Sequence, residues 1–373
     1  MILELEEIKK IIDIIEADYF FADNFERWKL IKETIEKDNM TSESVDERLS
    51  LMGDMHLRLL NVENPKFIHL CDLNLNGEKI LLFNSGQYME VEKINNMQAS
   101  EILQKYQDRY PLFSMRQAFM IMQQDMKVAR REFEGDITIV ADGESHLFHK
   151  EPVESLRKQV DMRKKISPVF LKRIGDTGVL IKIITFDVPN IYLDFVAAMK
   201  DEMVKKAHNV IFDLRDNCGG KIDQTKKILE WVINSDFEFP YVIKDKNGKE
   251  YFLNTKKGSD NCDYLQNKRF FVFVNENTAS AAEYVFANGL KLACSDRTII
   301  VGKKTVGLSG QARVYAINEQ TLLNVTVKRY FDIFGNELQS GIIPDIEIDN
   351  SLDILQNRDV LVDWYIAEEA AIE

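Results

Sequence analysis

The first sixty residues carry hydrophobic side chains at intervals of three and four positions. The stretch LEEIKKIIDIIEADYF, residues 5–20, shows this spacing, and a Ser/Thr capping signal opens the stretch TSESVDERLSLMGDMHLRLL, residues 41–60. Apolar residues that repeat in this way share one face of an α-helix. The pattern therefore predicts an amino-terminal helical segment over residues 1–60.

The pattern changes over residues 61–165. Residues 65–95 alternate between apolar and polar side chains and contain Asn-Gly and Ser-Gly pairs, which are typical of strands joined by tight turns. Residues 98–132 return to helical spacing, with many methionine and aromatic side chains that we interpret as core. We therefore expect a mixed α+β cap over residues 61–165.

From about residue 166 predicted strands and helices alternate. The apolar runs TGVLIKIITF, NVIFDLRDN, KRFFVFVNEN and DRTIIVG are predicted strands, separated by amphipathic segments such as QTKKILEWVINS. This order favours crossover units on a largely parallel sheet, and therefore an α/β lobe over residues 166–350 with a helical tail over residues 351–373. Ligands bind at the carboxyl ends of such strands, where the polar stretches DLRDNCGG (213–220) and NENTASAAE (275–283) fall.

Composition narrows the class of protein. The chain has 373 residues with 45% hydrophobic and 29% charged side chains, as in ordinary globular proteins. Its formal charge of −13 disfavours a nucleic-acid partner, and no apolar run is long enough to predict a membrane span. The acidic start MILELEEIKKII is unlike a signal peptide, and four scattered cysteines indicate reduced thiols. We expect a cytoplasmic protein.

Ser280 lies where the third strand of this lobe gives way to a helix. Together with Glu283 it forms a Ser-x-x-Glu capping box, which would make it an ordinary helix cap. A serine at a helix start is also well placed as a nucleophile, because the helix end and the amide of Ala281 favour negative charge. Gly219 and Gly220 would be a turn if taken alone, but on a neighbouring strand they could present a second amide to an oxyanion.

The stretches NVIFDLRDNCGG, VNENTASAAE, IIVGKKTVG and GIIPDIEI resemble, in order and spacing, the motifs of the S41 serine peptidases. This family includes tail-specific proteases, the tricorn core protease and the nisin-resistance protein. The resemblance covers about residues 165–350 and implies a ClpP/crotonase-like α/β fold. It implies that Ser280 is the nucleophile and that Gly219, Gly220 and Ala281 hold the oxyanion. Asp213 and Arg215 are then interpreted as a buried ion pair that orients the glycine turn.

The proton acceptor differs between branches of the family. Tail-specific members use a lysine after Thr-x-Gly, but Leu308 occupies that position here, and Lys303 and Lys304 precede the threonine. The other branch takes a histidine from the amino-terminal region, and SLMGDMHLRLL resembles its Asp-x-His stretch. The resemblance therefore implies His56 as general base, whereas His56 taken alone would be expected to cap or pack at a helix end.

A histidine base needs an orienting acid. Glu337 precedes the Gly-x-x-Pro-Asp motif as in the tricorn-like branch, although Leu338 occupies the expected position, and Asp54 or Glu283 could serve instead.

His146 and His149 are three residues apart, but their surroundings are typical of strand and loop, so we expect no metal site. The helical spacing of residues 98–132 disfavours the PDZ domain of many tail-specific members.

The expected function is peptide-bond hydrolysis through an acyl-enzyme, without a cofactor. We expect small, unfolded or precursor peptides as substrates, and homo-oligomerisation is left open. Two alternatives remain. The chain could be a peptide-binding protein of the same fold whose chemistry has lapsed, because the family lysine is missing and the glutamate is displaced. It could also be an esterase or amidase that acts on small acyl compounds.

Overall fold

The structure is a computed structural model of the whole chain, and it describes residues 2–21, 25–36, 40–61, 67–69, 71–84, 87–127, 129–152, 167–257, 263–349 and 358–372. The chain divides into two compact units. The first consists of Met1–Lys164 and Gln311–Lys328, and the second of Lys165–Gly310 and Arg329–Glu373. The segment 311–328, which the sequence pattern places in the catalytic lobe, thus belongs to the first unit.

The amino-terminal part of the first unit is helical, as the spacing predicts. Its elements are α1(Leu5–Asp18), α2(Phe25–Ile35), α3(Ser42–Leu49) and the 3₁₀ turn η1(Ser50–Met52). The apolar stripe of α1, which includes Ile8, Ile11 and Ile15, is buried. It belongs to one core with β1(Arg58–Asn61) and β18(Thr321–Asp332). These two strands pair antiparallel, from Arg58 opposite Asn324 to Asn61 opposite Thr321.

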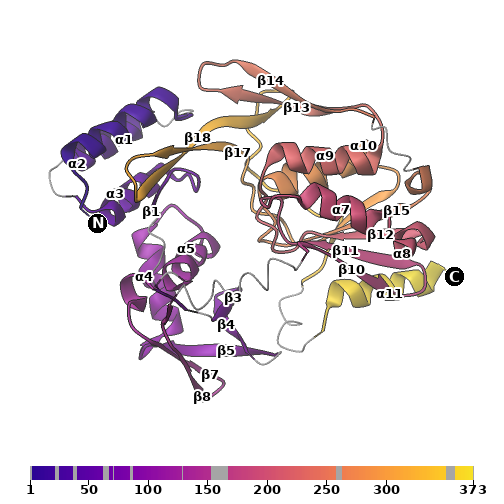
Figure 1. Cartoon of the computed structure of the whole chain (residues 1–373), viewed down its shortest axis with the longest axis horizontal. Coiled ribbons are helices and arrows are strands. Elements are labelled where there is room, and N and C mark those ends of the chain that lie inside the picture. The colour runs from indigo at the N-terminus through magenta and orange to yellow at the C-terminus, as the bar shows by residue number, and fades with distance from the viewer. Residues whose placement is uncertain are drawn as a thin grey trace. The chain divides into compact units, whose positions relative to one another are not determined.

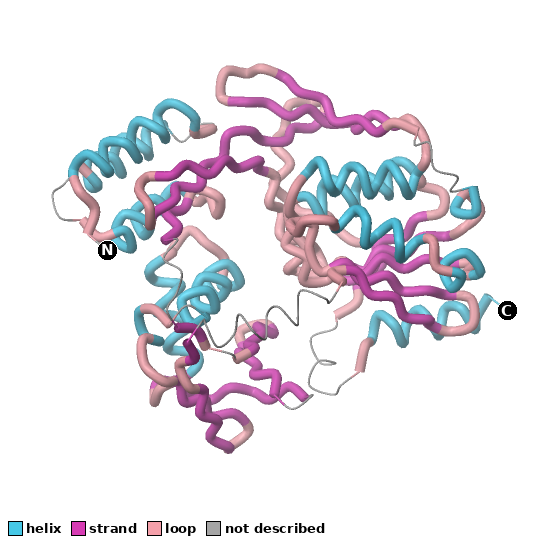
Figure 2. Tube along the Cα trace, viewed as in Figure 1, coloured by secondary structure: helices cyan, strands magenta, loops and turns pink. Residues whose placement is uncertain are grey.

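The rest of the first unit is the expected α+β region. Its elements are β2(Phe67–Ile68), β3(Asp72–Asn76), β4(Lys79–Asn84), β5(Gln87–Ile94), β6(Met97–Gln98), α4(Ala99–Arg109), α5(Met115–Lys127), η2(Arg131–Phe133), β7(Ile137–Ala141), β8(Glu144–Phe148) and β9(Glu151–Pro152). Figure 2 shows α4 and α5 as helices beside these strands. The methionine and aromatic stripe is core, because Phe119, Met122 and Met126 are fully buried.

The second unit is built on a six-stranded sheet with the order β10-β11-β12-β15-β16-β19. The strands are β10(Val169–Ile174), β11(Gly178–Ile183), β12(Asn209–Asp213), β15(Arg269–Val274), β16(Thr298–Gly302) and β19(Ile346–Glu347). The pairs from β11 to β19 are parallel, and only β10 runs antiparallel to its neighbour. The structure confirms the predicted α/β class with a parallel-rich sheet.

Helices flank this sheet in the second unit. They are α7(Ile191–Met199), α8(Glu202–Lys206), α9(Ile222–Ile233), the π-helix η4(Ala281–Ala287), α10(Asn288–Ala293) and α11(Val360–Ile372). The unit also contains β13(Phe237–Asp245), β14(Glu250–Thr255) and η3(Asp263–Leu265), whereas β17(Gly310–Ala316) belongs to the first unit from its second residue on. Of the predicted tail over residues 351–373, α11 is observed, while residues 351–357 lie outside the described residues.

The two faces of the sheet carry separate cores, because successive side chains of a strand point to opposite sides. Phe212 and Val272 pack with α7, α9 and η4 on one face, while Ile211 and Phe271 pack with α11 on the other. Figure 1 shows α7, α9 and α10 on one side of the strands and α11 on the other. Burying each of these side chains contributes about 1.5–3 kcal/mol. The sheet is thus a rigid base for the loops at its carboxyl end.

Candidate active site

The two polar loops predicted to meet at the carboxyl end of the sheet do meet there. They follow β12 and β15, which pair in parallel register up to Asp213 opposite Phe273. The amide of Ala279 donates to the carbonyl of Asn217 at 3.0 Å, and the Thr278 hydroxyl donates to the Leu214 carbonyl at 2.9 Å. Backbone and side chain therefore fix the glycine loop against the turn that carries Ser280.

Ser280 has a strained backbone. Its φ is +55° and its ψ −123°, a conformation that residues with a Cβ rarely adopt. Such outliers cost about 1–3 kcal/mol and persist at sites where the surrounding structure enforces them. Here the enforcing contact is made by Glu283, whose carboxylate accepts the Ser280 amide at 2.8 Å. A helix cap alone has no need for this backbone conformation, since capping residues are normally extended.

The predicted capping box is nevertheless formed, and it opens an unusual helix. The seven residues after Ser280 form a π-helix, in which the amide of Asn288 donates to the carbonyl of Glu283. π-Helices are rare and are frequent at functional sites. The capping interpretation of Ser280 and the nucleophile interpretation are therefore compatible, because the same turn satisfies both.

Glu283 anchors a further loop beside Ser280. Its fully buried carboxylate also accepts hydrogen bonds from the amides of Gly307 and Leu308, at 3.0 and 2.7 Å, and from the hydroxyl of Thr305. Burial raises the pKa of this carboxyl group, against the opposing effect of these donors. The structure thus gives Glu283 the role of tying the loop around Leu308 to the start of the π-helix.

The glycine loop and the start of the π-helix each contribute one amide for which the described residues offer no hydrogen-bond acceptor. The Gly219 amide donates to Asn217 Oδ1 at 2.9 Å, whereas the amides of Gly220 and Ala281 make no hydrogen bond within the described part of the chain. A Cβ on Gly219, whose φ is +94°, would lie 2.9 Å from both Ser280 Cβ and the Ala281 nitrogen. Only glycine fits there. Of the three amides assigned to the oxyanion, the geometry therefore favours Gly220 and Ala281.

Asp213 and Arg215 form the predicted buried ion pair. Asp213 is 1% exposed, and the guanidinium of Arg215 donates to both of its oxygens, at 2.8 and 2.7 Å. Burial would raise the pKa of Asp213, but Arg215 outweighs it and holds the pKa below its usual value. Arg215 also donates to both oxygens of Asp359, at 2.8 Å each. No local pattern in the sequence marks Asp359 as a partner of Arg215, because the two residues lie 144 positions apart.

His56 lies in the first unit, in the turn between η1 and β1. Asp54 Oδ1 accepts the His56 amide at 2.9 Å, and Asp54 Oδ2 accepts the hydroxyl of Tyr19 at 3.2 Å. The 3₁₀ turn η1 ends at Gly53, whose φ is +74°. The imidazole is thus carried by a tight turn that Asp54 closes, and it is half-buried.

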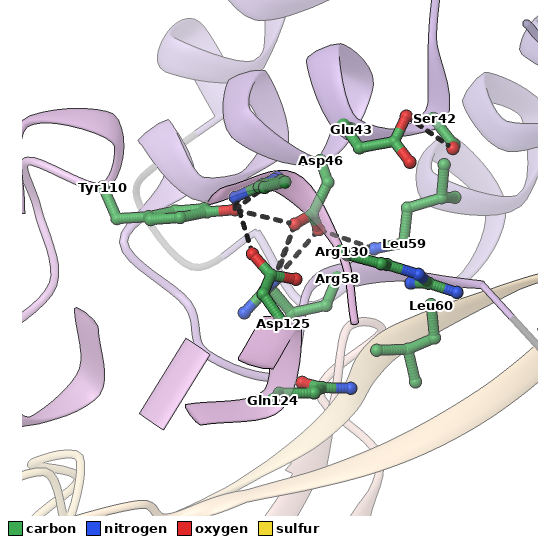
Figure 3. A pocket seen from close by; sticks show the side chains of 11 residues that line it. Ser42, Glu43, Asp46, Arg58, Leu59, Leu60, Tyr110, Gln124, Asp125 and Arg130 are labelled. Carbon is green, nitrogen blue, oxygen red and sulfur yellow. Dashed lines mark hydrogen bonds and ion pairs between the residues drawn. The ribbon is translucent and has the colours of Figure 1, made fainter. Parts of the chain in front are cut away.

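The strand after His56 is fixed by a buried charge cluster. The guanidinium of Arg58 donates to both oxygens of Asp46, and Asp46 also accepts the Leu59 amide at 2.8 Å and the Tyr110 hydroxyl at 3.4 Å. Figure 3 shows the side chains of Asp46, Arg58 and Tyr110 together with that of Asp125. These residues line a cavity of about 30 Å³ in the first unit. The cavity holds little more than a water molecule or two, so we assign the cluster a structural role.

Glu337 lies in the second unit, in the loop after β18. Its carboxylate accepts a hydrogen bond from the guanidinium of Arg329 at 2.6 Å, and both side chains are mostly buried. Leu338 is held by its amide, which donates to the carbonyl of Tyr330 at 2.9 Å. Glu337 is therefore an ion-paired carboxylate on an ordered loop.

No group of three His, Cys, Asp or Glu side chains among the described residues could hold a metal ion. His149 lies 3.0 Å from Asp136, and His146 lies on β8. Nor does any helix in the described ranges have the length and apolar character needed to cross a bilayer.

Comparison with known proteins gives one family. Residues 178–348 match the family model of Peptidase family S41. The chain is 28% identical over 155 residues to "Carboxyl-terminal-processing peptidase 3, chloroplastic" of Arabidopsis thaliana, which covers 41% of this chain and 28% of that protein. It is 28% identical over 161 residues to "Carboxy-terminal processing protease CtpB" of Bacillus subtilis, covering 42% and 31%. The chain thus spans only 28–39% of the length of such relatives.

Solved structures share the fold over most of the chain. The photosystem II D1 C-terminal processing protease superimposes with a TM-score of 0.59 at 16% identity, over 92% of this chain and 93% of that one. Mature CPAF complexed with lactacystin gives a TM-score of 0.67 at 10% identity, over 98% and 96%. At these identities the likeness is one of fold.

Proposed function

Since residues 178–348 belong to peptidase family S41, a family of serine peptidases, we propose that the chain hydrolyses peptide bonds with Ser280 as nucleophile. The observation that carries this proposal is the strained Ser280 backbone next to the amides of Gly220 and Ala281, to which no described residue offers an acceptor. A serine in such a turn presents its hydroxyl and an oxyanion site together, as acyl transfer requires.

We propose the following course for the reaction. Ser280 Oγ attacks the substrate carbonyl while His56 accepts the hydroxyl proton, and the oxyanion that forms is bound by the amides of Gly220 and Ala281. The tetrahedral intermediate then expels the amine, which receives the proton from His56. Water, deprotonated by His56, attacks the acyl-enzyme, and the acid leaves as His56 returns the proton to Ser280 Oγ. Loss of one oxyanion donor would cost about 3 kcal/mol in such a site.

The assignment of His56 as the base is supported by its sequence context and by Leu308. Leucine occupies the position where tail-specific members carry a lysine, and its side chain cannot accept a proton. His56 is followed by a strand that a buried ion pair holds in place. For the orienting acid we keep Glu337, a carboxylate that its ion pair with Arg329 holds on an ordered loop.

The names of the curated relatives suggest the class of substrate. Both are described as processing carboxyl termini. We propose that this chain likewise cleaves unfolded or precursor peptides near a carboxyl end. The test is to incubate the protein with one peptide in two forms, one with a free carboxyl terminus and one amidated, and to quantify the products by mass spectrometry.

The proposal predicts cleavage by the wild type, faster for the free carboxyl terminus, and none by Ser280→Ala. Cleavage that survives in S280A would contradict the nucleophile. Equal rates on both peptides would contradict carboxyl-end selection and leave the peptidase assignment intact. Hydrolysis of p-nitrophenyl esters without any peptide cleavage would indicate an esterase instead.

We also propose that the enzyme acts in the cytoplasm. The four cysteines of the sequence are scattered along the chain and form no Cys-x-x-Cys pair. In a chain of this size such cysteines indicate reduced thiols, which are typical of reducing compartments. Subcellular fractionation of the native host tests this, and recovery of the protein outside the cytoplasm would contradict it.

A further inference from the structure

The ion pair beside the glycine loop continues into the carboxyl-terminal helix. Arg215 divides its donors between two carboxylates: Nε and Nη2 bind Asp213, while Nη1 and Nη2 bind Asp359 at 2.8 Å each. The Arg215 side chain is 13% exposed, so its charge is largely removed from water. A guanidinium in such a position is stable only with well-placed anions on both sides.

Asp359 is also the cap of α11. Its Oδ1 accepts the amide of Val362 at 3.2 Å, and its carbonyl accepts the amide of Asp363 at 2.8 Å, which is the first hydrogen bond of the helix. One carboxylate therefore starts the helix and holds Arg215. The position of the helix start and the position of the guanidinium are set by the same side chain.

The far end of α11 is fastened as well. The carboxylate of Glu369 accepts the amides of Asp176 and Thr177, at 3.0 and 2.7 Å, in the turn between β10 and β11. Between these ends, Leu361 and Tyr365 are buried against the sheet face opposite α7 and α9. The helix is thus fixed along its length, and Asp359 is held at a defined place at the carboxyl end of the sheet.

Through Arg215 this fixed point reaches the glycine loop. Asp213 ends β12, and the loop from Leu214 to Gly220 begins directly after it. Arg215 is part of that loop, and its amide also donates to Asp213 Oδ1 at 3.1 Å. Without Asp359, Arg215 would keep one carboxylate and lose half of the contacts that fix its orientation.

We propose that Asp359 is a positioning residue, through which the carboxyl-terminal helix holds the glycine loop in the conformation that binds the oxyanion. This rests on the proposed function, because the loop matters for catalysis only if Ser280 reacts. Asp359 touches no reacting atom in this scheme. Its effect is transmitted by Arg215, and it should appear in the rate of acylation and not in substrate binding.

The test compares Asp359→Ala, Asp359→Asn and Asp359→Glu with a matched control, Asp363→Ala. Asp363 lies in the first turn of the same helix but pairs with Arg358 at the surface. Two measurements are made on each full-length protein: kcat and KM for peptide cleavage, and hydrogen exchange of the backbone amides of residues 214–220. Asp359→Asn retains a capping oxygen, which keeps the comparison valid if the alanine variant unfolds.

We expect Asp359→Ala to lower kcat about tenfold with KM within twofold of wild type, an effect smaller than the loss of an oxyanion donor. Hydrogen exchange of the amides of residues 214–220 should be faster in Asp359→Ala than in wild type. Asp359→Asn should show the same changes in kcat and exchange. Asp359→Glu should recover part of kcat, and Asp363→Ala should match wild type in both measurements. Unchanged kcat and unchanged exchange in the asparagine variant would overturn the proposal, as would a change confined to KM. If the wild type cleaves nothing, the proposed function fails, and the exchange comparison alone decides whether Asp359 holds the loop.

Discussion

At the scale of the residue, the conformation of Ser280 is the strongest sign of function in this structure. Its positive φ is enforced by the Glu283 carboxylate on one side and by the close approach of Gly219 on the other. A protein selected for stability alone would place glycine or an extended cap there. The strain therefore indicates that the hydroxyl has a use.

This strain can be measured by exchanging Ser280 for two residues that both lack the hydroxyl. Ser280→Gly removes the Cβ and relieves the strain, whereas Ser280→Ala keeps it, so we expect the glycine variant to be about 1 kcal/mol more stable. Chemical denaturation of both variants gives the free energies of unfolding. At Ser145, which lies on the regular strand β8, the same pair should show the usual order with glycine less stable. The opposite order at Ser280 would refute strain there.

The proposed oxyanion donors could be narrowed to three amides from the sequence, but not to two. The sequence indicates the glycine pair and Ala281, because a Gly-Gly turn after a buried strand allows close backbone approach. It could not separate Gly219 from Gly220. The two amides differ because the side chain of Asn217 accepts the hydrogen bond of the Gly219 amide. The direction in which the Asn217 side chain points is set by the surrounding fold and cannot be predicted from the local sequence.

At the scale of the element, the ion pair between Asp213 and Arg215 at the end of β12 makes the free energy of unfolding depend on pH. The pKa of Asp213 lies below its usual value because Arg215 outweighs the effect of burial. A carboxyl group with a lowered pKa in the folded state stabilises the protein above its unfolded-state pKa. That stability is lost as the pH falls through the folded-state pKa.

Asp213→Asn should therefore lower the free energy of unfolding by about 3 kcal/mol at neutral pH, because it leaves Arg215 without its main partner. The difference from wild type should begin to shrink as the pH falls below the usual aspartate pKa of about 4. It should continue to shrink down to the lowered pKa of Asp213 in the folded wild type, below which that carboxyl group is protonated. Denaturation curves at several pH values measure this. Asp223→Asn, at an exposed position in α9, should change stability by less than about 0.5 kcal/mol. A difference for D213N that is independent of pH would contradict the assignment.

Most elements of the second unit could be predicted, because strands such as β12 and β15 are buried on both faces and appear as continuous apolar runs. The π-helix could not. Over seven residues, its periodicity does not differ enough from that of an α-helix to leave a signal in the pattern of apolar side chains. Asp359 was missed for a different reason: its partner Arg215 is 144 positions away, and nothing local marks the pairing.

At the scale of the whole molecule, the division into units was the least predictable feature. Residues 311–328 follow the loops of the candidate active site in sequence, yet they belong to the first unit, where β18 pairs with β1. Pairing between such distant segments leaves no periodic trace in either one. Domain boundaries predicted as contiguous stretches of sequence therefore cannot include a segment such as 311–328, where the chain returns to the first unit.

The proposed nucleophile and base also lie in different units, with Ser280 in the second and His56 in the first. Their assignment as a pair came from the resemblance of two separate motifs, together with Leu308 in place of a lysine. Catalysis by this proposed pair therefore requires a functional link between two segments that no local pattern connects.

The most direct test of this claim is active-site labelling. A fluorophosphonate is added to four proteins: the wild type, Ser280→Ala, His56→Ala and, as a control, His149→Ala. The adduct is followed by intact-mass spectrometry and mapped by peptide sequencing. His149 is exposed and lies beside Asp136, so its loss should not matter. We predict one adduct on Ser280 in the wild type and in His149→Ala, none in Ser280→Ala, and a rate at least about 100-fold lower in His56→Ala. An unlabelled wild type, or a His56→Ala variant that reacts as fast as wild type, would contradict the account.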